Sequence, residues 1–168
     1  VSYDGNMINV TSEGWQGYLD EHGKKFILSE EGKYIELPSK FSWGRDFKNG
    51  IAEVLINGCE NLVDKEFNLV LKKDDITIPI DKSIEYIVER DCAGNCIFVR
   101  DKKYGLISSK GEIVIDAKYH RLSILSFGFY VAAIKDDNIY CNALGIIDVD
   151  ENIILNFEYS TIEPLKGK

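Results

Sequence analysis

A short motif recurs four times along the 168 residues of the chain, and this internal repeat limits the folds that the chain can adopt. In each copy a glycine or an asparagine, both of which tolerate positive φ, is followed by two apolar residues. These anchor residues lie 44, 44 and 40 positions apart: Gly17, Asn61, Gly105 and Gly145. Residues 104–119 also align with 144–159 without a gap. This period predicts about four tandem structural units of 40–44 residues.

The pattern within each unit indicates β-strands. The anchor begins a short apolar strand, a turn follows, and a β-branched strand such as residues 113–115 comes next. Further along, a second recurring glycine precedes another strand: Gly50, Gly94 and Gly128. No segment combines a 3.6-residue apolar period with helix caps. The sequence therefore predicts an all-β fold with roughly three antiparallel strands per unit, about twelve in total.

The units are expected to form a single domain over residues 1–168, with boundaries at about 14–57, 58–101, 102–140 and 141–168. Either a stacked meander or a small pseudo-symmetric closed structure would fit this pattern. In a closed structure, residues 7–10 would supply the strand that completes the last unit. An open edge on the last unit would instead favour a fragment of a longer protein, because exposed edges invite aggregation.

The repeated residues resemble the WG-repeat family, also called KWG repeats. The resemblance rests on a glycine with two apolar residues and an aspartate, a Gly-Lys turn, a β-branched strand, Lys-Tyr, and a later Gly-apolar-Ala-x-Val, and repeats three and four carry it best. At the position of the family's Trp-Gly dipeptide stand Gln16-Gly17, Glu60-Asn61, Tyr104-Gly105 and Leu144-Gly145. The resemblance implies a β-repeat scaffold, usually bacterial, with no common catalytic activity.

The composition excludes several functional classes. The formal net charge of −8 and the pI of about 4.8 argue against direct binding to nucleic acid. No apolar run approaches the ~18 residues of a membrane span, and four cysteines are too few for a disulfide scaffold. No signal-peptide pattern is visible, so a cytoplasmic protein is expected. The start at Val1 is also compatible with a trimmed terminus or a fragment.

Repeats one and two carry about ten extra residues, near 28–37 and 72–81. Both insertions contain an acidic pair at the equivalent position, and a longer loop in repeat three contains a third pair: Glu30 and Glu31, Asp74 and Asp75, Asp136 and Asp137. Insertions in repeat arrays cluster on one face, often the binding face. The pairs are therefore candidates for an acidic surface that binds a basic protein, the alternative being ordinary solvated turns.

Aromatic residues near these loops are the second group of candidates. Trp43, with Arg45 and Asp46 beside it, is the best candidate for an exposed contact, because Trp, Tyr and Arg are typical interface anchors. The alternative is packing between units, which is the favoured interpretation for Trp15 and Phe47.

The remaining chemical motifs favour ordinary structural roles. Cys92 and Cys96 are four positions apart, unlike a redox or zinc pair, and Cys96 stands where a small buried strand residue is expected. Residues 148–152 begin like a calcium loop but lack its glycine, so a hairpin turn is expected there. His22 and His120 lie in no catalytic or metal-binding motif. We therefore expect no catalytic residues, metal or cofactor.

These observations favour a non-enzymatic protein-binding module. The most concrete hypothesis is an immunity protein or antitoxin whose acidic loops neutralise a basic toxin, a nuclease being one candidate. The alternative is a fragment of a larger envelope or surface-associated WG-repeat protein that binds a partner protein or a glycan. An enzyme of unrecognised type is the third and least favoured hypothesis.

Overall fold

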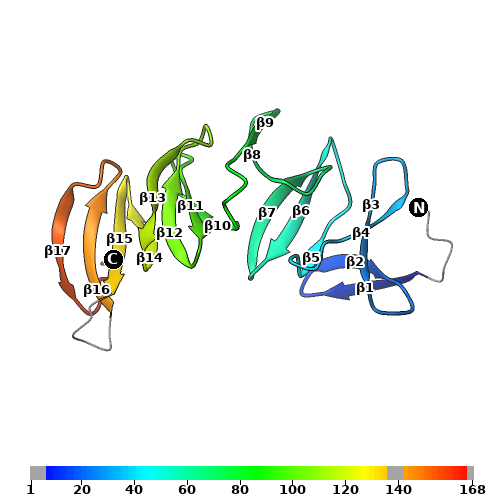
Figure 1. Cartoon of the computed structure of the whole chain (residues 1–168), viewed down its shortest axis with the longest axis horizontal. Helices are drawn as coiled ribbons and strands as arrows, with labels where there is room; N and C mark the ends of the chain where they lie inside the picture. The colour runs from blue at the N-terminus through cyan, green and yellow to red at the C-terminus, as the bar shows by residue number, and fades with distance from the viewer. Residues whose placement is uncertain (1–6, 136–141, 166–168) are drawn as a thin grey trace. The chain divides into compact units, whose positions relative to one another are not determined.

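The computed structural model describes residues 7–135 and 142–165, and these residues confirm the all-β expectation. Seventeen strands form four antiparallel sheets, and no helix occurs among the described residues (Figure 1). That part of the chain accordingly holds no helix long and apolar enough to cross a membrane. Two compact units make up the chain, Val1–Lys82 and Ser83–Lys168, and each contains two sheets.

In the first unit, each strand pairs with its neighbour in sequence. The first sheet contains β1 (Ile8–Ser12), β2 (Trp15–Leu19), β3 (Lys25–Leu28) and β4 (Tyr34–Glu36). The second sheet contains β5 (Trp43–Gly44), β6 (Ile51–Ile56), β7 (Cys59–Asp64), β8 (Leu69–Lys73) and β9 (Ile76–Pro79).

The second unit repeats this meander with four strands in each sheet. Its first sheet contains β10 (Tyr86–Arg90), β11 (Cys96–Arg100), β12 (Lys103–Ile107) and β13 (Ile113–Tyr119). Its second sheet contains β14 (Arg121–Ser126), β15 (Phe129–Lys135), β16 (Asn142–Asp148) and β17 (Ile153–Tyr159).

All four sheets are open meanders, with a strand at each edge. The expectation that residues 7–10 complete the fourth repeat is wrong, because β1 pairs with β2 and the last sheet consists of β14 to β17. The expected boundaries after residues 57 and 101 fall in the turns of the β6–β7 and β11–β12 hairpins. The second, third and fourth sheets therefore each combine strands from two successive repeats, whereas the first joins β1, which precedes repeat one, to strands of repeat one.

The extra residues of repeats one and two form strands of their own. β4 pairs with β3, and β9 pairs with β8, so each insertion folds back as a hairpin on the strand that follows the anchor turn of its repeat. In repeats three and four the corresponding strands, β13 and β17, are longer, carry register shifts and form the sheet edge. The insertions thus add one strand to each of repeats one and two, while repeat three, without an insertion, has four strands, β12 to β15, where three were expected.

A side chain three positions after each anchor builds the turn that follows. Asp20, Asp64 and Asp148 accept two backbone N–H groups through Oδ1, at 2.8–3.0 Å, and Ser108 does the same through Oγ at 3.2 and 3.3 Å. Such side chains stabilise tight turns by replacing a backbone hydrogen bond. The residue six positions after each anchor has a positive φ: Gly23, Phe67, Gly111 and Glu151.

Close packing, and not positive φ, explains the anchor glycines, which corrects the expectation from the sequence. None of the four anchor residues has a positive φ: Gly17, Asn61, Gly105 and Gly145. A Cβ added to Gly105 would lie 2.6 Å from the carbonyl oxygen of Ile115 and 2.6 Å from Cζ of Phe98. A Cβ on Gly145 would lie 2.7 Å from the carbonyl oxygen of Leu155. Only a residue without a side chain fits at these two positions.

The core of the second unit lies between its sheets and is made of fully buried apolar side chains, including Ile97, Leu106, Ile115, Tyr130 and Ile147. Cys96 is also buried, as expected for a small strand residue. In the first unit Trp15 and Phe47 are each only 6% exposed, which places both in the core as the sequence favoured.

Phe67 occupies the positive-φ turn position with φ 62°, where repeats one and three have glycine. Its ring packs against Phe41, with ring centroids 6.1 Å apart, and against Phe47 at 5.7 Å. Phe67→Gly would relieve a backbone cost of about 1–2 kcal/mol. It would also remove a half-buried ring, and full Phe→Ala truncations in cores cost about 3–5 kcal/mol.

We therefore expect Phe67→Gly to destabilise the first unit by about 2 kcal/mol. Urea unfolding followed by tryptophan fluorescence measures this, since both tryptophans lie in that unit. Glu66→Gly in the same turn is the control, with an expected loss below about 1 kcal/mol. A more stable Phe67→Gly protein would contradict the packing role.

Candidate functional site

The acidic pairs of repeats one and two lie in equivalent hairpins of the first unit, as their spacing predicted. Glu30 and Glu31 lie in the loop between β3 and β4, and Asp74 and Asp75 form the two-residue turn between β8 and β9. All four residues are exposed. We call these two elements the extension hairpins. Asp136 and Asp137 lie outside the described residues.

Glu30 joins three turns of the first unit. Its Oε2 lies 3.2 Å from Nζ of Lys65 in the β7–β8 turn, and its Oε1 accepts the backbone N–H of Gly50 at 3.2 Å. The Lys65 ammonium and the Gly50 amide hold the pKa of the Glu30 carboxyl below its usual value. Glu30 therefore ties the first extension hairpin to the framework, and its carboxylate is already engaged within the unit.

The other three acids are more available for an external contact. Hydrogen bonds from its own backbone amide and from the Ser29 hydroxyl lower the pKa of Glu31, which keeps this residue ionised near neutral pH. Within residues 7–135 and 142–165, neither Asp74 nor Asp75 forms an ion pair. Ile76, directly after Asp75, is 67% exposed. The β8–β9 tip thus combines two carboxylates with an exposed aliphatic side chain.

Trp43 covers the anchor of repeat one and is only half-buried. A Cβ on Gly17 would lie 3.1 Å from Cζ3 of Trp43, so the indole ring closes over that glycine. Nζ of Lys25 lies 4.9 Å from the centroid of the same ring, within the range of a cation–π interaction. The Trp43 ring on β5 therefore packs onto a glycine of another strand, β2.

Arg45 and Asp46 are exposed but have partners within the first unit. The guanidinium of Arg45 lies 4.8 Å from the ring centroid of Trp15, and its Nε lies 3.1 Å from Glu53. Oδ1 of Asp46 accepts the backbone N–H of Leu28 at 2.9 Å. These contacts give both residues structural roles, and their predicted role in binding a partner stays a prediction.

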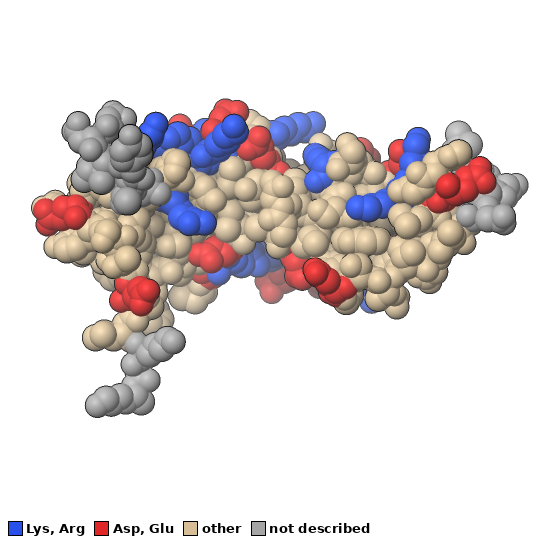
Figure 2. Space-filling view, turned by 90° about the horizontal axis from the view of Figure 1, so that it is seen from below, with Lys and Arg blue, Asp and Glu red and all other residues tan. Residues whose placement is uncertain are grey.

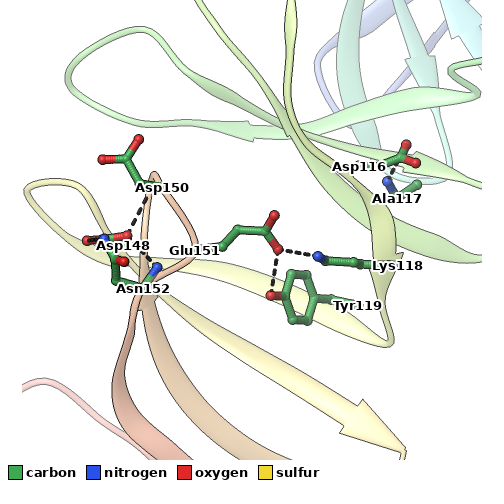
Figure 3. Close-up of polar contacts among 8 residues, drawn as sticks. All are labelled: Asp116, Ala117, Lys118, Tyr119, Asp148, Asp150, Glu151 and Asn152. Carbon is green, nitrogen blue, oxygen red and sulfur yellow. Dashed lines mark hydrogen bonds and ion pairs between the residues drawn. The ribbon is translucent and has the colours of Figure 1, made fainter.

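In the second unit, buried tyrosines donate to carboxylates of neighbouring turns. The Tyr119 hydroxyl donates to Oε1 of Glu151 at 2.9 Å, and Nζ of Lys118 lies 2.5 Å from the same oxygen (Figure 3). Glu151 lies in the turn between β16 and β17, has a φ of 62° and contacts both side chains from there. Tyr130 likewise donates to Oδ2 of Asp91 at 2.5 Å. These bonds connect successive sheets of the unit.

The pKa values of these groups follow from burial and from the hydrogen bonds. Burial, then the hydrogen bond to Glu151, raises the pKa of Tyr119, and burial with the bond to Asp91 raises that of Tyr130. Burial alone would raise the pKa of Asp91, but hydrogen bonds from Tyr130 and Asn95 outweigh it and lower the value. Both tyrosines are therefore neutral donors at neutral pH, and the lowered pKa keeps the Asp91 acceptor ionised.

The expected calcium-like segment is a hairpin turn. Oδ1 of Asp148 accepts the N–H groups of Asp150 and Asn152, and the Asn152 side-chain amide donates to Oδ2 at 2.8 Å (Figure 3). Within the described ranges, no group of three or more His, Cys, Asp or Glu side chains could hold a metal ion.

On the face shown in Figure 2, acidic and basic side chains of the described residues are interspersed in each unit.

Two exposed apolar residues at hairpin tips were missed from the sequence, Ile76 and Phe127. Phe127 lies between β14 and β15 and is 87% exposed. A signal for Phe127 was present, because Phe127-Gly128 stands where repeat one has Asn49-Gly50. Asn-Gly is favoured in such turns and phenylalanine is not, so the phenylalanine at this position distinguishes the turn from that of repeat one.

Comparison with known families agrees with this repeat register. Residues 104–138 match the family model of the WG containing repeat, from the anchor strand β12 through β15. The chain contains a WG repeat. The matched segment is repeat three, one of the two that carry the sequence pattern best, and WG repeats are typical of β-repeat protein-binding modules. No curated protein shows significant similarity to the chain.

The raised pKa values of Tyr119 and Tyr130 make the stability of the second unit depend on alkaline pH. A group whose pKa is raised by folding contributes stability that is complete below its unfolded value, here 10.0, and is lost as the pH rises above it. We expect the stability of the second unit to fall above about pH 10, by up to about 1.4 kcal/mol per pH unit for each tyrosine.

Tyr130→Phe should flatten this pH dependence while lowering the stability at pH 7, because the bond to Asp91 is lost. Urea midpoints by circular dichroism between about pH 7 and 11 measure both effects. The exposed Tyr159→Phe is the control and should keep the full alkaline loss. An unchanged alkaline loss in Tyr130→Phe would contradict the linkage.

Proposed function

We propose that this protein is a non-enzymatic protein-binding module whose partner is a basic protein. In its most concrete form it is an immunity protein or antitoxin that occludes a cationic toxin, with a nuclease as one candidate class. The extension hairpins bind the partner, and the four-sheet framework holds them in place. The proposal concerns binding alone, and it assigns no catalytic step to any residue.

The observation that carries the proposal is the chemistry of the β8–β9 tip. Asp74 and Asp75 are exposed there, and Ile76 beside them is 67% exposed. Protein interfaces commonly place an apolar anchor inside a polar or charged rim. Glu31 adds a further exposed carboxylate in the equivalent hairpin of repeat one. These side chains lie in the insertions of repeats one and two, which repeats three and four lack.

The net charge supports a basic partner in a second way. At −8, the chain attracts cationic proteins over distances of about a Debye length, roughly 10 Å at 0.1 M salt. Such attraction mainly accelerates association and favours partners of opposite charge. A basic toxin that acts on a polyanion would present the complementary surface, and carboxylates at the hairpin tips would compete for it.

The test compares two triple variants that change the net charge equally. Glu31→Gln with Asp74→Asn and Asp75→Asn removes the acids of the extension hairpins and leaves the Glu30 ion pair intact. The control, Asp101→Asn with Glu112→Gln and Glu158→Gln, removes three exposed acids of the second unit. Both variants have a net charge of −5, because each loses three negative charges from −8.

The partner is first captured from lysate of the source organism, and its affinity is then measured by calorimetry at low and high salt. We expect the hairpin variant to bind at least about tenfold more weakly and with a smaller salt dependence, and the control to change affinity less than about threefold. Equal effects of the two variants, or a partner without a basic surface, would contradict the proposed role of the hairpins.

A further inference from the structure

Phe127 is an exception among the tight turns of this protein. Six two-residue turns join residues that pair as antiparallel partners within the described ranges, and their first positions are Glu13, Asn49, Asn57, Asp74, Asp101 and Phe127. Every first position has a positive φ. The other five residues are polar, and four of them are asparagine or aspartate, which tolerate this conformation best.

The backbone at Phe127 departs from the other tips as well. Its φ is 24°, whereas the five polar residues have φ between 49° and 54°. Residues held in sparsely populated backbone regions cost free energy and often mark functional sites. Packing within the described residues does not offset this cost, because the side chain is 87% exposed. Phe127 therefore stabilises neither its own turn nor the core of its unit.

The surroundings of Phe127 form a small apolar patch. Phe129, two residues later, is 39% exposed, and the intervening Gly128 has no side chain. The whole β14–β15 hairpin, residues 121–135, contains no acidic residue. In a chain of net charge −8 this hairpin offers aromatic surface and no carboxylate of its own. Clustered exposed aromatics of this kind are typical of interaction sites.

Carboxylates lie beside this patch on the neighbouring turn. Phe129 on β15 pairs with Asp148 on β16, so the tip of the β14–β15 hairpin and the β16–β17 turn lie at the same end of the sheet. Asp150 in that turn is exposed, and its carboxylate projects away from the hydrogen-bonded turn (Figure 3). Hydrogen bonds from Asn152 lower the pKa of Asp148, which keeps it ionised. The patch thus has an acidic border on this side.

We propose that Phe127 is the anchor of a second partner-binding site, and that it inserts into an apolar pocket bordered by lysine or arginine side chains on another protein. The pocket must be apolar because the ring brings no polar group, and basic at its border because the exposed carboxylate of Asp150 would face it. This inference rests on the proposed protein-binding function but not on the extension hairpins. A lipid surface is the disfavoured occupant, because the adjoining carboxylates and the net charge oppose anionic headgroups.

The first variant separates binding from folding. Phe127→Asn installs the Asn-Gly turn that repeat one uses at residues 49–50, so the hairpin should fold as well or better. We expect its Tm to equal or exceed that of the parent and its affinity for the partner to fall at least tenfold. Phe127→Tyr, which keeps the ring, should retain binding. A lower Tm with unchanged affinity would overturn the proposal.

Photo-crosslinking identifies the occupant. p-Benzoylphenylalanine is placed at position 127, at 76 in the second extension hairpin, and at 49 as the control on an equivalent tip. Irradiation in lysate of the source organism should give a protein adduct at 127 that is absent at 49. Mass spectrometry should locate the attachment in an apolar segment flanked by basic residues. The same variants are tested for co-sedimentation with neutral and anionic phospholipid vesicles.

The outcomes distinguish this inference from the proposed function. An adduct at 76 without one at 127 would overturn the Phe127 site and leave the proposed function standing. Adducts at neither position would overturn both. A lipid adduct, vesicle binding that Phe127→Asn abolishes, or an adduct between two copies of this chain would each overturn the assigned occupant.

Discussion

The close approach of two backbones at the anchor glycine constrains the strand that follows the turn in repeats three and four. In repeats three and four the strand after the turn folds over the anchor, and its carbonyl oxygen leaves no room for a Cβ on Gly105 or Gly145. In repeat two the corresponding strand, β8, pairs with β7 at only two positions, and the anchor is Asn61. Its side-chain amide donates to the carbonyl of Cys59 at 3.3 Å. An asparagine fits where the strand does not fold over.

The strand after the anchor turn also differs between the repeats in what lies beside it in the sheet. An exposed edge strand is an aggregation hazard, and proteins cover it or distort it with bulges. β3 and β8 are covered by the inserted strands β4 and β9, whereas β13 and β17 carry register shifts. The inserted strands create the extension hairpins, and therefore the acidic tips. The binding surface that we propose is thus a consequence of how repeats one and two extend their sheets by one strand.

The sequence predicted the features that depend on local chemistry. The all-β fold, the repeat register, the turn at residues 148–152 and the equivalent positions of the acidic pairs all followed from spacing and residue type. The contacts of Glu30, Trp43 and Arg45 could not be predicted, because their partners, apart from Glu53 beside Arg45, lie 18 to 35 residues away in the sequence. The reason for the anchor glycines was also missed, since close packing and positive φ select the same residue.

The anchor contact is tested most directly by a reciprocal substitution. Gly105→Asn places a side chain against the carbonyl of Ile115, and Asn61→Gly removes the side chain where it is tolerated. Their free energies of unfolding are measured in urea by circular dichroism. If the close approach is decisive, Gly105→Asn loses about 3 kcal/mol or more, and Asn61→Gly loses about 1 kcal/mol. Equal losses, or a Gly105→Asn protein as stable as the parent, would contradict it.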